Sequence, residues 1–328
     1  MRMGKKLCIL MILILFTATG CKTVSSPLAQ RPLDQSKPVV YTSIYPMYDF
    51  ASKIGKDKID LRLMIPPGAE PHDWEPSAKM MVEMENADVL IYNGAEMETW
   101  IDKVIESLSN EKLIIVEAVK DIDLIKFKEH EHEHEEEHEE EHEEEEQEDE
   151  HHHGEYDPHV WLDPIRAMQQ AESIKNALIK ADAENKDFYE SNYSEFVEKL
   201  FTLDTKFKDS LKNRKRDEIV VAHAAFGYMA DRYGLEQISV LGLSPQEEPS
   251  AAKLAELAEE IKEHDIRFIF FETLTSPKLS QVLASETGAE TAVLNPLDGL
   301  TAEDMTAGKD YISVMEENLS NLIKALGE

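Results

Sequence analysis

Short apolar runs alternate with amphipathic segments over the first half of the chain. The predicted strands are Val39–Ile44, Leu61–Ile65, Val89–Tyr92 and Leu113–Val116, and the predicted helices are Ser77–Ala87 and Glu98–Leu108. Short apolar strands that alternate with helices are typical of a mainly parallel sheet with helices on both faces. The first half of the chain therefore predicts one α/β lobe.

A second series of strands and helices begins beyond Asn213. Its predicted strands are Ile219–Val221, Gln237–Leu241, Phe268–Phe271 and Ala292–Leu294, and its predicted helices lie near 224–232, 250–264, 277–287 and 302–326. The same alternation of elements indicates a second α/β lobe.

Two longer amphipathic segments separate the two series. The first covers residues 164–182, and the second runs from Asn185 to Leu211 with apolar residues three and four positions apart. At 1.5 Å per residue the second helix would extend about 40 Å, which is longer than most domain helices. The pattern predicts an α/β fold in which two βα lobes with mainly parallel sheets are bridged by one long helix. Ligands of such folds bind at the carboxyl ends of strands, so the expected site is the cleft between the lobes.

Composition divides the chain into five expected parts. They are a signal peptide (1–20), a lipidated cysteine with a flexible tether (21–37), an N-terminal lobe (38–183), a linking helix (184–213) and a C-terminal lobe (214–328). The tether is inferred from a polar segment that contains Pro and Ser.

The N-terminus predicts export and a lipid anchor. The basic residues Arg2, Lys5 and Lys6 precede the apolar run Leu7–Phe16, which is too short to cross a bilayer as a permanent helix. Small residues then lead directly to Cys21, as in the lipobox of a bacterial lipoprotein. We expect lipidation of Cys21 and a location on the extracytoplasmic face of the cell membrane. The alternative is a plain secretory signal with an incidental cysteine.

The chain is strongly acidic, with 34 Lys and Arg against 67 Asp and Glu and a formal net charge of −33. This charge argues against nucleic acid as a partner, because a phosphate backbone needs clustered cations. Much of the acidity lies in one insert at 129–153, here called the tract, which has no apolar side chains to form a core.

The tract also contains eight of the twelve histidines in the chain. These are His130, His132, His134, His138, His142, His151, His152 and His153. Interleaved imidazoles and carboxylates suit weakly held, exchangeable divalent ions, which indicates auxiliary metal binding. The alternative is a solvated loop without a measurable role.

Four histidines lie outside the tract, and three of them follow apolar runs at positions expected to face the cleft. These three are His72, His159 and His223, whereas His264 lies near a predicted helix C-terminus, where it favours the helix dipole. A single histidine is more often structural than a ligand, but three in matching positions favour a metal site. Neutral imidazole is a common Zn²⁺ ligand, and a carboxylate could complete a tetrahedral set.

Four motifs together give the chain a specific resemblance to a known family. They are Pro71–Ser77, Asp157–Pro164, Val221–Phe226 and Leu294–Leu300. With these motifs the chain resembles the metal-binding lipoproteins that serve bacterial ABC importers, especially the high-affinity zinc branch. The resemblance covers the chain from Lys37 to the C-terminus apart from the tract. It implies two lobes joined by a rigid long helix, with the metal in the cleft between them.

The resemblance also implies the roles of particular residues. It places four metal ligands at His72, His159, His223 and Asp298. The third position is His in zinc importers and Glu in many manganese importers. Glu272 is implied as a carboxylate behind the ligands or in the cleft, and Asp157 could orient the imidazole of His159. Asp298 could instead be a turn residue before Gly299, and Glu70 is a weaker competing ligand.

These observations predict a binding protein that is not an enzyme. It would capture Zn²⁺ outside the membrane and deliver it to an ABC permease and its ATPase, as a monomer held by its lipid anchor. One alternative is a binding protein of the same type for manganese or another divalent metal. Others are a surface adhesin and a zinc metallohydrolase with Glu272 as base, although the usual hydrolase motifs are missing from the sequence.

Overall fold

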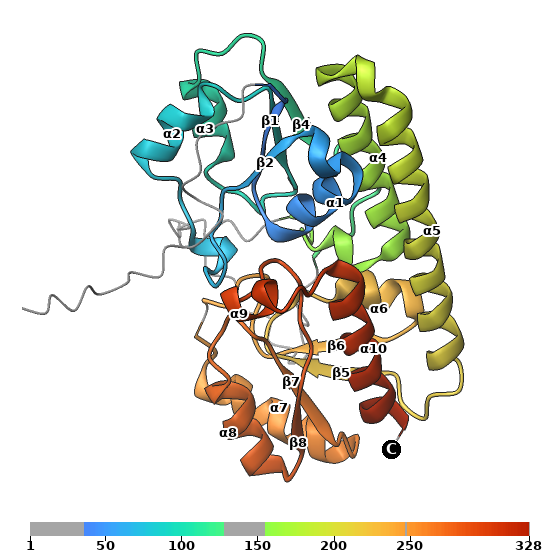
Figure 1. Cartoon of the computed structure of the whole chain (residues 1–328). Coiled ribbons are helices and arrows are strands. Elements are labelled where there is room, and N and C mark those ends of the chain that lie inside the picture. The colour runs from blue at the N-terminus through green and yellow to red at the C-terminus, as the bar shows by residue number, and fades with distance from the viewer. Residues whose placement is uncertain (1–35, 128–154, 247, 328) are drawn as a thin grey trace, which may run out of the picture.

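The structure, a computed structural model, describes residues 36–127, 155–246 and 248–327 (Figure 1). The signal segment, Cys21 and the eight histidines of the tract lie outside these ranges. Among the described residues, no helix combines the length and the apolar character that crossing a bilayer requires.

The first sheet is parallel and has the strand order β2-β1-β3-β4. Its strands are β1 (Val39–Thr42), β2 (Asp60–Leu63), β3 (Val89–Tyr92) and β4 (Ile114–Glu117), and its first helices are α1 (Tyr45–Gly55), α2 (Ala78–Met84) and α3 (Ile101–Ser107). Val40 of β1 pairs with Leu61 on one side and with Val89 on the other. All four residues of β1 are buried, because helices cover both faces of the sheet.

The second sheet repeats this arrangement, with the order β6-β5-β7-β8. Its strands are β5 (Glu218–Val221), β6 (Glu236–Ser239), β7 (Phe268–Phe271) and β8 (Glu290–Val293), and its helices include α6 (Gly227–Tyr233), α7 (Ala251–Glu263) and α8 (Lys278–Thr287). The expected α/β fold with two lobes and parallel sheets is therefore confirmed.

Three long helices run along one side of the molecule. They are α4 (Pro164–Ala181), α5 (Lys186–Leu211) and α10 (Tyr311–Gly327). The continuous helix α5 has 26 residues and passes both lobes (Figure 1). It packs against α1 and α4 near the first sheet and against α6 and α10 near the second. One apolar core extends through both lobes and includes Phe50 of α1 and Phe226 before α6, so the lobes are packed together.

Several predicted elements differ from the observed ones. Helix α1 was not predicted. Its N-cap, the apolar residue Ile44, was included in the predicted strand, and Pro46 occupies the first turn of the helix. The predicted helix 302–326 is two helices, α9 (Ala302–Thr306) and α10, and the chain between them turns at Gly308 with φ +78°. Helix α3 was expected from Glu98 but begins at Ile101.

Candidate metal centre

His72 lies in a short 3₁₀ turn, Pro71–Asp73, which follows β2. The carboxylate of Glu70 precedes the turn and accepts a hydrogen bond from the backbone N–H of His72 at 3.2 Å. The backbone N–H of Gly68 donates to the carbonyl of Leu300 at 2.9 Å. This bond joins the segment that carries His72 to the C-terminal lobe.

His159 is held by polar contacts rather than by a strand. It was expected at a strand end, but it lies between an isolated bridge at Tyr156 and a 3₁₀ turn, Val160–Leu162. The side-chain amide of Asn93, at the end of β3, donates to the carbonyl of Pro158 at 2.9 Å. Asn93 in turn accepts from Gln170 of α4 at 2.8 Å.

Glu98 completes this buried network. Its carboxylate accepts hydrogen bonds from the backbone N–H groups of Asn93 and Gly94 at 2.9 and 3.0 Å. Asn93, Glu98 and Gln170 were not predicted from the sequence as site residues. The available signal was a polar residue, Asn93, directly after the apolar strand β3. The network fixes the loop in which His159 is fully buried.

Each of the two most deeply buried histidines has a carboxylate behind it. Asp157 Oδ1 accepts from the backbone N–H of His159 at 2.9 Å and contacts His159 Nδ1 at 2.8 Å. Glu272 Oε1 accepts from the backbone N–H of His223 at 3.2 Å and contacts His223 Nδ1 at 2.6 Å. Glu272 and His223 meet because they follow the adjacent parallel strands β7 and β5. Because both carboxylates contact Nδ1, the Nε2 atom of each imidazole faces the other histidine, where a metal could bind.

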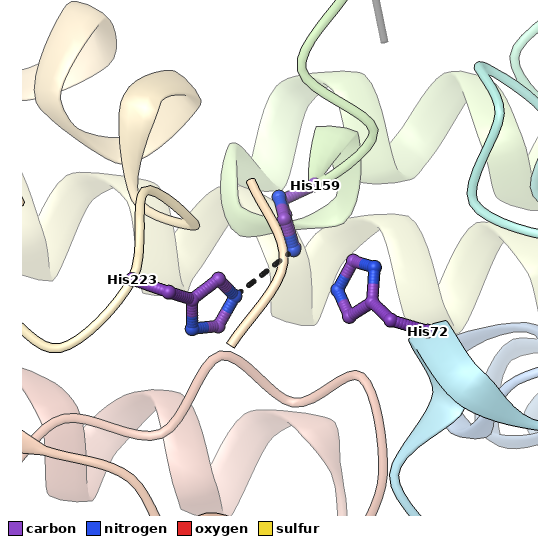
Figure 2. Close-up of side chains that lie close together, drawn as sticks. All are labelled: His72, His159 and His223. Carbon is purple, nitrogen blue, oxygen red and sulfur yellow. Dashed lines mark hydrogen bonds between the residues drawn. The ribbon is translucent and has the colours of Figure 1, made fainter. Parts of the chain in front are cut away.

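Figure 2 shows the three imidazoles of His72, His159 and His223 pointing toward one another from separate elements. One nitrogen atom from each ring lies within 4.8 Å of the other two. The Nε2 atoms of His159 and His223 are 3.4 Å apart. Two nitrogen ligands of a tetrahedral Zn²⁺ are about 3.3 Å apart when each Zn–N bond is about 2.05 Å. The pair of buried imidazoles therefore already has the spacing of a zinc site.

Asp298 lies in the loop after β8 and is 2% exposed. Its Oδ1 accepts from the backbone N–H of Gly299 at 2.8 Å. Asp298, Glu70 and His72 form a second group of possible ligands within 4.8 Å of one another. His72 therefore belongs to both groups of possible ligands, and Glu70 lies beside Asp298.

Burial and charge give the three histidines different pKa values. Burial lowers the pKa of His72 and of His159 well below the usual range, and the neighbouring imidazoles lower both further. Burial also opposes protonation of His223, but the carboxylate of Glu272 raises its pKa to about 9. At neutral pH His223 is therefore protonated and donates one N–H to Glu272 and the other to His159 Nε2.

The pKa values of two buried carboxylates, Asp157 and Asp298, are raised. Burial raises the pKa of Asp157 to about 7. Burial and the nearby carboxylate of Glu70 raise the pKa of Asp298 well above its usual range. A bound dication would offset the cost of charging these groups, so the site is electrostatically suited to a cation.

Aromatic packing supports the histidines. Trp161 is fully buried beside His159, with ring centroids 5.4 Å apart, and its Nε1 donates to the carbonyl of Pro296 at 2.7 Å. The hydroxyl of Tyr311 donates to the carbonyl of Trp161 at 2.6 Å. Trp74 packs edge-on against Trp100 at 5.2 Å. The two hydrogen bonds of Trp161 tie the loop around His159 to the C-terminal lobe.

Comparison with known proteins shows the family of the chain. The family described as zinc-uptake complex component A, periplasmic, matches residues 40–325. The high-affinity zinc uptake system protein ZnuA of Bacillus subtilis is 44% identical over 287 residues, which are 88% of this chain and 87% of that protein. The zinc-binding lipoprotein AdcA of Streptococcus pneumoniae is 42% identical over 86% of this chain, which spans 54% of the length of AdcA.

Solved structures show the same fold. The Zn(II)-bound ZnuA-like domain of Streptococcus pneumoniae AdcA matches with a TM-score of 0.74 and 38% identity, over 89% of this chain and all of that domain. The laminin-binding protein Lmb of Streptococcus agalactiae, described as bifunctional with adhesin and metal transporting activity, matches with a TM-score of 0.74 and 29% identity over 88% of this chain and 99% of Lmb. The chain belongs to the family of the periplasmic component A of zinc-uptake complexes.

Proposed function

We propose that this protein captures Zn²⁺ outside the cytoplasmic membrane and delivers it to an ABC permease and its ATPase for import. The observation that carries the proposal is the 3.4 Å separation of the Nε2 atoms of His159 and His223, with a third imidazole beside them. This is the donor type and the spacing that tetrahedral zinc requires. Relatives named for zinc uptake and zinc binding support the same choice of cargo.

We assign the zinc ligands to His72, His159, His223 and Asp298. Asp157 and Glu272 position two of the imidazoles by contacting Nδ1, which leaves Nε2 to bind the metal. A carboxylate that accepts from Nδ1–H also makes the imidazole a stronger metal ligand.

The site favours binding over catalysis. A catalytic zinc keeps an open coordination position for water and substrate, whereas His159 and His223 are fully buried. Glu272, the base of the hydrolase alternative, already contacts both the backbone N–H and Nδ1 of His223. A carboxylate occupied in this way supports an imidazole and is poorly placed to activate a water molecule.

A second candidate cargo is a divalent ion that prefers oxygen, such as Mn²⁺. The observation in its favour is the carboxylate of Glu70, which lies within reach of His72 and Asp298. Three imidazoles nevertheless favour Zn²⁺, because Mn²⁺ is better served by a majority of oxygen donors.

Attachment and assembly are also part of the proposal. We infer that lipid on Cys21 holds the protein at the extracytoplasmic face of the membrane, that it acts as a monomer, and that the tract collects additional zinc. The sequence motif at Cys21 and the composition of the tract support these inferences.

Metal content tests the proposed function. The protein purified without added metal should contain one tightly held zinc, and competition titrations should rank Zn²⁺ far above Mn²⁺. His159→Ala should weaken the tight zinc site at least about 100-fold, because it removes a ligand rather than a supporting contact. His264→Ala is the matched control, since His264 lies away from the site and contacts Glu218 at 3.2 Å. Equal affinity in the two variants, or a tight manganese site, would contradict the proposal.

A further inference from the structure

The centre contains more potential metal donors than one tetrahedral ion needs. The imidazoles of His72, His159 and His223 form one group of three donors, and Glu70, His72 and Asp298 form another. His72 is the member that both groups share. The first group offers only nitrogen, whereas the second offers two carboxylates and one imidazole.

Solvent reaches the two groups unequally. His159, His223 and Asp298 are buried, whereas Glu70 and His72 are partly exposed. Glu70 and His72 therefore form the side of the centre that solvent reaches, although the Oε2 atom of Glu70 and the Nε2 atom of His72 are themselves buried.

The second group is held by contacts between the lobes. Gly299, next to Asp298, lies beside the N-terminal lobe, and an added Cβ would be in van der Waals contact with the carbonyl oxygen of Ala69 at 3.5 Å. The hydrogen bond from Gly68 to Leu300 joins the same two segments. The donors are thus fixed across the cleft by backbone contacts and do not depend on mobile side chains alone.

Two donor atoms of this group are available for an ion. Glu70 uses Oε1 to accept from the backbone of His72, and its Oε2 atom is buried without a hydrogen-bond partner among the described residues. The Nε2 atom of His72 is likewise buried and unpartnered within the described part of the chain. Buried polar atoms without partners are costly, and a metal ion would satisfy both of these.

We propose that Glu70, His72 and Asp298 form an outer subsite, which receives a divalent cation and passes it, by exchange of Glu70 for the imidazoles of His159 and His223, to the zinc site formed by His72, His159, His223 and Asp298. Two carboxylates and one imidazole suit weak, rapidly exchanging binding, whereas three imidazoles hold Zn²⁺ more selectively. The outer subsite deepens the proposed function and rests on it, because it presupposes that the inner site binds zinc.

Binding kinetics test the subsite. Zinc association and dissociation would be followed in the full chain by stopped-flow tryptophan fluorescence, since Trp161 lies beside His159. Glu70→Gln should slow both association and dissociation by about fivefold and leave the equilibrium affinity nearly unchanged, because it removes an intermediate rather than a final ligand. Glu75→Gln, at an exposed position in the same segment, is the matched control and should leave both rates unchanged.

Three results would overturn the subsite. They are unchanged rates in Glu70→Gln, a faster dissociation that shows Glu70 to be a final ligand, and an equal loss of association rate in Glu75→Gln that shows general charge attraction. A wild-type protein without tight zinc binding would instead refute the proposed function itself.

An equilibrium measurement provides a second, independent test. In the variant His159→Gln/His223→Gln the outer group is intact, and titration with Mn²⁺ followed by electron paramagnetic resonance should count one weak equivalent more than in the same variant with Glu70→Gln. Adding Glu75→Gln instead should keep that equivalent, and the tract contributes equally to both. Identical counts would overturn the subsite. The kinetic test uses a single conservative change, so it decides the question even if the double variant fails to fold.

Discussion

The carboxylate of Asp157 lies against Gly227 across the boundary between the lobes, so closely that a Cβ at Gly227 would be 2.4 Å from Asp157 Oδ2. Asp157 uses its other oxygen to hold the backbone and Nδ1 of His159. Because Gly227 of the C-terminal lobe has no side chain, there is room for the carboxylate of Asp157. This carboxylate orients His159, a proposed zinc ligand in the N-terminal lobe.

Gly227→Ala should displace Asp157 and weaken zinc binding about tenfold, as expected when a carboxylate behind a metal-binding histidine is lost. Competition titration of zinc measures this effect. Gly327→Ala is the control, because a Cβ there meets no described atom within 4 Å. If the two variants bind zinc equally well, the contact between Gly227 and Asp157 does not position His159.

Zinc binding at pH 7 should release at least one proton. The pKa of His223 is raised to about 9 by Glu272, so this imidazole is protonated before zinc arrives and must lose the proton that lies between it and His159. Zinc affinity should consequently rise with pH by about tenfold per unit from this proton, up to about pH 9. Calorimetry in buffers of different ionisation enthalpy counts the released protons.

Glu272→Gln provides the matched comparison for this proton count. Without the carboxylate, the pKa of His223 loses the largest influence that raises it, and only the charges of Asp298 and Glu70 oppose the effect of burial, so the number of protons released at pH 7 should fall. The same heat of zinc binding in all buffers for the wild-type protein would show that His223 is already neutral.

Asp49 should make the folded state less stable at alkaline than at acidic pH. Burial raises the pKa of Asp49 to about 7, and its Oδ2 has no hydrogen-bond partner among the described residues. A folded-state pKa above the unfolded value contributes stability below about pH 4, and this contribution is lost as the pH rises through about 7. Lys53, at 3.8 Å, offsets only part of the cost.

Asp49→Asn removes this titration. Relative to the wild-type protein, the variant should gain up to about 3 kcal/mol in the free energy of unfolding between pH 5 and pH 8. Urea unfolding at the two pH values measures the gain. Asp57→Asn, at an exposed position, is the matched control for the loss of one carboxylate. A constant difference between Asp49→Asn and wild type at both pH values would contradict the raised pKa.

Deleting the segment Glu129–Glu150 should leave the tight zinc equivalent intact, because the proposed ligands all lie outside it. The weaker zinc equivalents should disappear, since the interleaved imidazoles and carboxylates of the tract would be gone. In the full chain, acidification to about pH 5 should release these ions first, as imidazoles with an ordinary pKa of about 6.5 become protonated. Calorimetry that shows loss of the tight equivalent would place primary ligands in the tract.

Much of the fold could be predicted because its signals are local. The residues of β3 and β7 match the predicted runs Val89–Tyr92 and Phe268–Phe271, and α5 differs from its prediction by one residue. Each of these elements has an apolar pattern bounded by polar or turn residues. Helix α1 was missed because only the two small polar residues Thr42 and Ser43 separate the apolar residues of β1 from Ile44, so periodicity alone does not show where the strand ends.

The sequence by itself determined the two α/β series, the long helix and the short list of residues able to bind a metal, because periodicity and residue chemistry are properties of neighbouring positions. Only the tertiary structure decided how these residues meet. Glu272 lies 49 positions from His223 and contacts it because β7 pairs with β5. Two further contacts likewise join segments that are distant in the sequence: Asn93 donates to the carbonyl of Pro158, and Glu70 lies beside Asp298. Such contacts leave no periodic trace in the sequence, since they arise from the packing of whole elements.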